Sequence, residues 1–149
     1  TTFAYLDERE AVAAAMDDPE KADFVRKNLR LARRQAEELE RNPALIILAI
    51  DGRIEGKNVG DLGGLYGSIL PAAWSLMLAL RARGLGSCWT TLHLYEEQEV
   101  ATILGIPEDV TQAVLLPVAY FTGDTFKPAK RLPAPEQIHR NGWGQHRQT

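Results

Sequence analysis

The sequence has little of what marks secreted or membrane proteins. It contains one cysteine, Cys88, which cannot form a disulfide within the chain, so nothing indicates an oxidising compartment. No apolar run reaches the ~18 uncharged residues that a membrane-spanning helix needs. No signal peptide is visible at the start. These absences predict a cytoplasmic protein with no membrane partner.

An excess of positive charge is also lacking. The 17 Lys and Arg residues are outnumbered by 20 Asp and Glu residues, which gives a formal net charge of -3. A general nucleic-acid binder usually has a basic face, so we expect no nucleic-acid partner. Apolar residues make up 45% and charged residues 25% of the chain, which is ordinary globular composition. A length of 149 residues predicts one domain over residues 1–149.

The familiar motifs of side-chain catalysis are missing. The histidines His93, His139 and His146, together with Cys88, lack zinc-ligand spacing, so we expect no metal site. There is no GxSxG elbow and no GxxxxGK phosphate loop. Apolar residues flank Cys88, which indicates an inert, buried side chain rather than a reactive thiol. The sequence therefore points away from hydrolysis or phosphoryl transfer by side chains alone.

The first 43 residues predict a short strand and two helices. Residues 2–6 are expected to form a strand that is already under way at the first residue, which suggests that the sequence begins inside a larger protein. A helix is expected over 8–16 and a second over 20–40, where Asp18 is the N-cap and Pro19 the first helical residue. The basic residues of the second helix indicate a solvated face, paired with glutamates, rather than a nucleic-acid patch.

The centre of the chain is the most apolar part. Residues 44–50 form a continuous apolar run, which predicts a strand buried on both faces. A Gly-rich loop over 52–64 leads to a helix over 65–83 that is apolar nearly all round. Such a helix is central or is covered by another chain, and it predicts a homodimer. Pro71 either lies near its start or kinks it.

The segment from Gly84 to Leu94 follows this helix. Gly84 and Gly86 are typical of a helix end followed by a core strand, which we expect over 87–92. The small and hydroxylated residues of the segment would also let a flat ligand approach the backbone. A helix is expected over 95–104, and a second buried strand over 114–120. Pro117 within that strand indicates an edge position or a bulge.

The order and spacing of several motifs resemble the nitroreductase family. The resemblance covers residues 66–143 well and the first 65 loosely. It rests on the motifs Ser68-x-x-Pro71-Ala72, residues 78–89 (LALRARGLGSCW), Val100-x-x-x-Leu104-Gly105-Ile106-Pro107, residues 128–133 (PAKRLP) and Asn141-Gly142-Trp143. It implies an α+β fold, an α/β/α sandwich in which helices flank a central, mostly antiparallel sheet. It also implies an intertwined dimer with flavin sites at the interface.

The resemblance implies an FMN-dependent oxidoreductase. Members of the family transfer hydride from NADH or NADPH through the flavin to nitroaromatics, quinones or related small acceptors. Arg131, with Lys130, would neutralise the FMN phosphate, and Pro71 would flank the ring edge. His93 would pack in the protein or contact the ring, or it could donate a proton or a hydrogen bond. A backbone N–H within 91–94 would point at the flavin N5, and the ring would lie along Trp89, Thr90, Thr91, Leu92, His93 and Leu94.

One feature of the family is not found in this sequence. Family members open with a basic segment, roughly Arg-x-Ser-x-Arg, that binds the phosphate and the ribityl chain. Its absence here leaves an alternative function open. In that alternative the protein is a truncated, non-catalytic relative that serves as a flavin-binding or interaction module.

Overall fold

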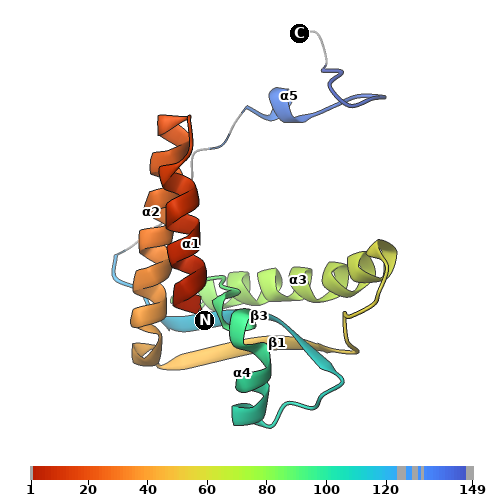
Figure 1. Cartoon of the computed structure of the whole chain (residues 1–149). Coiled ribbons are helices and arrows are strands. Elements are labelled where there is room, and N and C mark those ends of the chain that lie inside the picture. The colour runs from red at the N-terminus through yellow and green to blue at the C-terminus, as the bar shows by residue number, and fades with distance from the viewer. Residues whose placement is uncertain (1, 124–126, 129–130, 132, 147–149) are drawn as a thin grey trace.

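The computed structural model describes residues 2–123, 127–128, 131 and 133–146. Helices and short antiparallel strands alternate along the chain (Figure 1). The elements are α1 (Thr2–Ala14), α2 (Pro19–Glu37), η1 (Leu39–Arg41), β1 (Ala44–Asp51), α3 (Val59–Arg81), β2 (Leu85–Ser87), η2 (Leu92–Glu96), α4 (Glu97–Leu104), β3 (Val110–Tyr120) and α5 (Ala134–Gln137).

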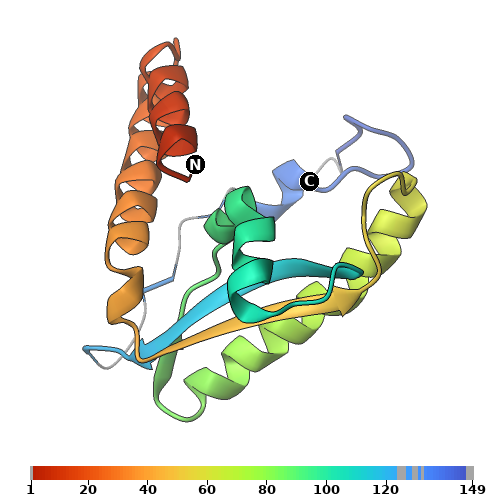
Figure 2. The same cartoon turned by 60° about the horizontal axis from the view of Figure 1, so that its bottom comes forward.

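The three strands form one antiparallel sheet in the order β1-β3-β2. Helix α3 lies against one face of the sheet, and η2 and α4 lie on the other (Figures 1 and 2). Helices α1 and α2 form an antiparallel pair that stands at one end of the sheet (Figure 2). This arrangement confirms the expected α+β class and the expected order of layers.

The core lies between α3 and the central strand β3. Its fully buried members are Ala73, Val114, Leu116 and Val118. The register between β1 and β3 shifts after Leu48, which faces Val114, whereas the next residue faces Gln112. Ala113 is therefore an extra residue on β3, which is the arrangement of a β-bulge. All residues from Thr111 to Val118 are buried, as expected for a central strand covered on both faces.

Pro117 was expected to mark an edge position or a bulge. It lies in the central strand β3, so the edge position was wrong, and the bulge of β3 lies four residues away at Ala113. Its carbonyl oxygen accepts a hydrogen bond from the Cys88 N–H at 3.3 Å. The antiparallel pairing of β2 with β3 extends to Ser87 and Val118. After a gap, one further bridge in the same register joins Thr90 to Leu115. Proline has no N–H to donate back to Cys88, and β2 accordingly ends at Ser87. The proline is tolerated because it faces this short, interrupted strand.

The strand expected over residues 2–6 is instead the first turn of α1, so that prediction was also wrong. Leu6 and Ala13 lie two turns apart on α1 and are both buried, as is Ala22 on α2. Burial at this helical spacing outweighs the alternation at Phe3 and Tyr5. The expected start of α2 is confirmed, because Pro19 is its first residue and the Asp18 side chain accepts the Lys21 N–H at 3.1 Å.

Helix α3 is longer and more exposed than expected. It begins at Val59, capped by Asn58, so the preceding loop is six residues shorter than predicted and Pro71 lies in the helix interior. Ala73 is its one buried residue, while Trp74 and Leu78 are 57% and 54% exposed. Strand β1 is likewise only partly covered. Neither element is buried on all sides within one chain.

The length and composition of α3 meet the minimum for a membrane-crossing helix, which the sequence had not been expected to contain. Among the described residues it is the single helix that does so, and a core helix of a soluble protein passes the same test.

Candidate functional site

Two connected grooves border the segment that follows β2. The first, about 400 Å³, lies between the paired helices α1 and α2 and residues 89–92, with Tyr5 and Tyr95 stacked at one side. The second, about 850 Å³, lies between α2 and residues 86–89. Trp89, which is 36% exposed, lines both of them. Four of the expected flavin-facing residues, Trp89–Leu92, therefore lie on the wall of one groove.

Thr90 fixes this wall to the sheet. It is 7% exposed, and its N–H and C=O exchange 3.0 Å hydrogen bonds with Leu115 on β3. Its hydroxyl accepts the Leu92 N–H at 3.3 Å, and the Leu94 N–H donates to the Thr91 carbonyl at 3.0 Å. Within the described part of the chain, the backbone N–H groups of Thr91 and His93 make no hydrogen bond. Of the two, Thr91 lines the groove, so its N–H is available to a ligand there.

The His93 side chain lies away from the two grooves. It lines a separate cavity of about 160 Å³, together with Thr2, Gln35 and Leu115. Both ring nitrogens are buried and have no partner among the described residues. Burial lowers the pKa of His93 below its ordinary value of 6.5, although the negative charge of Glu97 opposes the shift. His93 is therefore a neutral imidazole at neutral pH, set behind the groove wall rather than on it.

We expect His93 to make the fold sensitive to mild acid. Because its folded-state pKa is lowered, the unfolded chain binds the proton more readily, so stability falls as the pH drops below about 6.5 towards the folded-state value. The His93→Gln variant cannot gain this charge. Urea unfolding from pH 7.5 to 5.5 should give a decline for the natural chain and a flat profile for the variant. Parallel profiles would contradict this role for His93.

The other expected ligand residues are not on these walls. Leu94 is half-buried in η2, and Pro71 is exposed on α3. Arg131 is exposed in the C-terminal segment, and Lys130 lies outside the described residues. None of Pro71, Leu94 and Arg131 is among the residues that line the three cavities. A single chain thus brings together the ring-facing segment but does not bring Arg131 or Pro71 to it.

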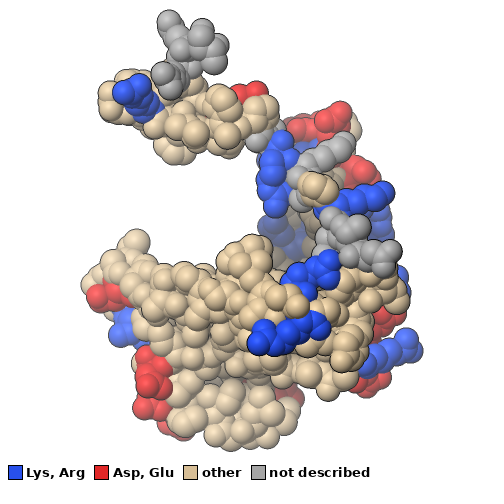
Figure 3. Space-filling model, turned by 180° about the vertical axis from the view of Figure 1, so that it is seen from behind, with Lys and Arg blue, Asp and Glu red and all other residues tan. Residues whose placement is uncertain are grey.

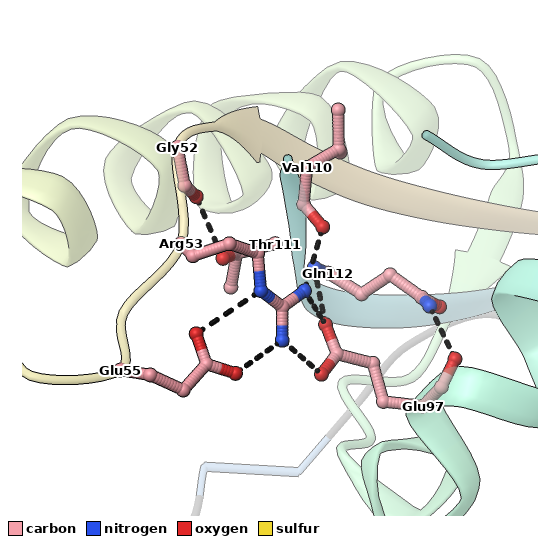
Figure 4. Close-up of polar contacts among 7 residues, drawn as sticks. All are labelled: Gly52, Arg53, Glu55, Glu97, Val110, Thr111 and Gln112. Carbon is pink, nitrogen blue, oxygen red and sulfur yellow. Dashed lines mark hydrogen bonds and ion pairs between the residues drawn. The ribbon is translucent and has the colours of Figure 1, made fainter. Parts of the chain in front are cut away.

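A polar cluster at the start of α4 fixes the other end of the segment (Figure 4). Arg53, which follows β1, donates to both carboxylate oxygens of Glu97 at 3.0 Å and to the Val110 carbonyl at 2.8 Å. Glu97 also accepts the Gln112 N–H at 3.1 Å, and the Gln112 side chain donates to the Glu97 carbonyl at 2.9 Å. Glu97 directly follows η2, so the cluster ties the loop after β1, the groove segment and β3 together.

Ion pairing shifts the pKa values of this cluster. The hydrogen bond from Arg53 lowers the pKa of Glu97 below its ordinary value, and burial of Glu97 opposes that shift. The hydrogen bond from Arg53 also lowers the pKa of Glu55 to about 2. Hydrogen bonds to Glu55 and Glu97 raise the pKa of Arg53. All three groups are charged at neutral pH, and no sequence motif had indicated them because Arg53 and Glu97 are 44 residues apart.

The fold and the groove together define a class of protein. In this class helices cover both faces of a central sheet, and a groove lies beside the segment that follows α3 and β2. The sequence model of the Nitroreductase family matches residues 6–120. The chain therefore belongs to the nitroreductase family, as its motifs had predicted.

Solved structures share this fold. One is a proposed NADH dehydrogenase/NAD(P)H nitroreductase from Parabacteroides distasonis, with a TM-score of 0.56 and 24% identity over 72% of this chain and 61% of that chain. A second is a mutant of NfnB, an FMN and NADPH-dependent nitroreductase from Sphigopyxis sp. strain HMH. Its TM-score is 0.55, and its identity is 19% over 95% of this chain and 60% of that chain. A third is a BluB-like flavoprotein from Clostridium difficile 630. Its TM-score is 0.58, and its identity is 15% over 95% of this chain and 73% of that chain.

The chain spans about three fifths of the length of the first two structures. No curated protein matches the sequence. The family model shows membership, and the structures, at these identities, show the fold.

Proposed function

We infer that this protein is an FMN-dependent oxidoreductase that uses NADH or NADPH to reduce a nitroaromatic, a quinone or a related small acceptor. Membership of the nitroreductase family supports an oxidoreductase. The observation that carries the proposal is the unused N–H donor of Thr91 on the groove wall, directly after Thr90, which hydrogen bonds fix to the sheet.

The residues of the groove suit a flavin. Trp89 offers a flat apolar surface beside the unused Thr91 N–H, and the hydrogen bonds between Thr90 and Leu115 hold that N–H in place. When bound, FMN would supply the redox chemistry, accepting electrons from the nicotinamide and passing them to the acceptor. The chain's own part would be to bind and orient. No acid or base on the groove wall is needed, and His93 lies in the separate cavity.

A homodimer, formed in the cytoplasm, is part of the proposal. The apolar residues Trp74 and Leu78 on α3 are more than half exposed, and Leu45 on β1 is 46% exposed. Exposed apolar side chains of this size on neighbouring elements favour cover by another chain. A second copy is the simplest cover, and it would also supply surfaces near Pro71. Sedimentation equilibrium should give twice the chain mass, and Trp74→Glu should shift it towards the monomer.

Flavin binding is the decisive test of the enzyme. Purified protein mixed with FMN and then desalted should be yellow, and it should oxidise NADH or NADPH when a quinone is added. A protein that binds FMN but shows no NAD(P)H oxidation would favour the flavin-binding module. A colourless protein that cannot be reconstituted would refute the proposal.

A further inference from the structure

The groove beside Trp89 has a second wall, formed by α2 and η1. Asn28, Ala32 and Gln35 lie along both parts of the groove. Arg34 and Arg41 line only the larger part, which faces residues 86–89. The groove therefore follows the helix axis, from the part beside Thr91 and Leu92 towards the C-terminal end of α2. An elongated ligand with one end at Thr91 would have its other end near the two arginines.

The charge at that end is positive. Lys and Arg side chains gather on the side of the molecule where α1 and α2 stand (Figure 3). Arg34, Arg41 and Glu38 line the groove, so its lining carries one positive charge more than negative. Arg34 uses its Nε to bond both oxygens of Glu38 at 3.3 and 3.4 Å. The Arg41 side chain, which also lines the groove, makes no hydrogen bond or ion pair with a described residue. The groove thus has one arginine fork without a partner and a second that is only partly used.

A third group in the same wall is short of a partner. The side-chain Nε2 of Gln35 is buried and makes no hydrogen bond with any residue that the structure describes. Gln35 lines both grooves and the cavity behind Thr90. A buried amide donor without an acceptor destabilises the folded chain. A ligand that offers a carbonyl oxygen or a ring nitrogen would remove that cost.

We propose that α2 and η1 recognise FMN through three side chains: Arg41 and Arg34 bind its phosphate, and Gln35 donates to the edge of its ring. The inference rests on the proposed function, since it assigns residues to the same cofactor. Arginine suits phosphate because its planar fork makes two parallel, charge-assisted hydrogen bonds. Of the basic residues of α2 that were interpreted from sequence as solvated, Arg34 lines the groove, and Arg41 of η1 lines it as well.

Comparing FMN with riboflavin, which lacks the phosphate, tests this assignment. Flavin fluorescence quenching would give both dissociation constants for the full chain. Arg41→Gln and Arg34→Gln should each raise the dissociation constant of FMN about tenfold, which is the effect of losing one charge-assisted contact. The dissociation constant of riboflavin should stay within about twofold of that of the natural chain. Glu38→Gln should tighten FMN alone, because it frees the Arg34 Nε. Gln35→Leu should weaken both flavins equally.

Arg30→Gln is the matched control, because Arg30 lies on the exposed face of α2 and lines none of the grooves. It should leave both affinities unchanged. An unchanged FMN-to-riboflavin ratio in the Arg34→Gln/Arg41→Gln double variant would overturn the assignment while flavin binding itself stands. If the FMN-to-riboflavin affinity ratio changed only in the Arg131→Gln variant, that result would also overturn the assignment. If the natural chain binds neither flavin, the proposed function fails before the variants are compared.

Discussion

Leu116→Ala should cost about 3 kcal/mol of the free energy of unfolding. Leu116 is fully buried at the centre of β3 and is the largest side chain in the core cluster between the sheet and α3. Removing its branched end loses the transfer free energy of the deleted carbons and leaves a cavity, because neighbours on a paired central strand cannot close in. Substitutions of this kind cost about 2–5 kcal/mol.

Urea unfolding at one fixed protein concentration would measure the loss. Leu31→Ala is the control, because the same truncation on α2 removes a side chain that is 58% exposed and should cost less than about 1 kcal/mol. Equal losses for the two variants would mean that the β3–α3 core does not dominate stability. A flavin-saturated sample should regain part of the loss, since a ligand that binds only the folded chain stabilises it.

The elements that could be predicted from the sequence are those with strong local signals. The Asp18-Pro19 helix start, the strand from Ala44, and Gly105 at the end of α4, with its positive φ of 67°, all depend on a few neighbouring residues. The segment from Trp89 to Leu92 was predicted through family motifs, and its place on a groove wall follows from pairing with β3. An available N–H within 91–94 was expected from the resemblance, but which residues would carry it could not be foreseen, because that depends on which acceptors the fold brings near.

The errors share one physical cause, which is tertiary context. Residues 2–6 alternate like a strand, but burial of Leu6 against α2 selects a helix. Pro117 is typical of an edge, yet it occupies the central strand because its neighbour β2 is short. Helix α3 was expected to be central or to be covered by another chain; its exposure in one chain excludes the first alternative and leaves the second as a prediction. Side-chain pairs distant in sequence, such as Arg53 and Glu97, leave no local signal.

The second large effect is expected at Glu97. Replacing it with Ala should cost about 2–3 kcal/mol, because the carboxylate bonds the Arg53 fork and the N–H of Gln112, a residue that is 1% exposed. Without Glu97, that buried N–H loses its acceptor and Arg53 loses its bidentate partner. Arg53→Met should cost less, about 2 kcal/mol, because 30% of the Arg53 side chain is exposed and the variant leaves the Gln112 bond in place.

A double-mutant cycle separates this pair from ordinary surface pairs. The double variant should lose less than the sum of the single losses, which gives a coupling of about 1–2 kcal/mol. The exposed Arg34–Glu38 pair is the matched control and should couple by no more than about 0.5 kcal/mol.

The pH dependence of the Glu97 pair adds an independent signature. The folded-state pKa of Glu97 is lowered. Its contribution to the free energy of unfolding is therefore present above the ordinary pKa of 4.5 and is lost as the pH falls through the folded-state pKa. A plot of the free energy of unfolding against pH should lack this loss in the Glu97→Ala variant. Because η2 runs directly into Glu97, amide exchange at Leu94, whose N–H bonds Thr91, should quicken in both single variants. Unchanged exchange there would show that the cluster stabilises the fold without fixing the groove wall.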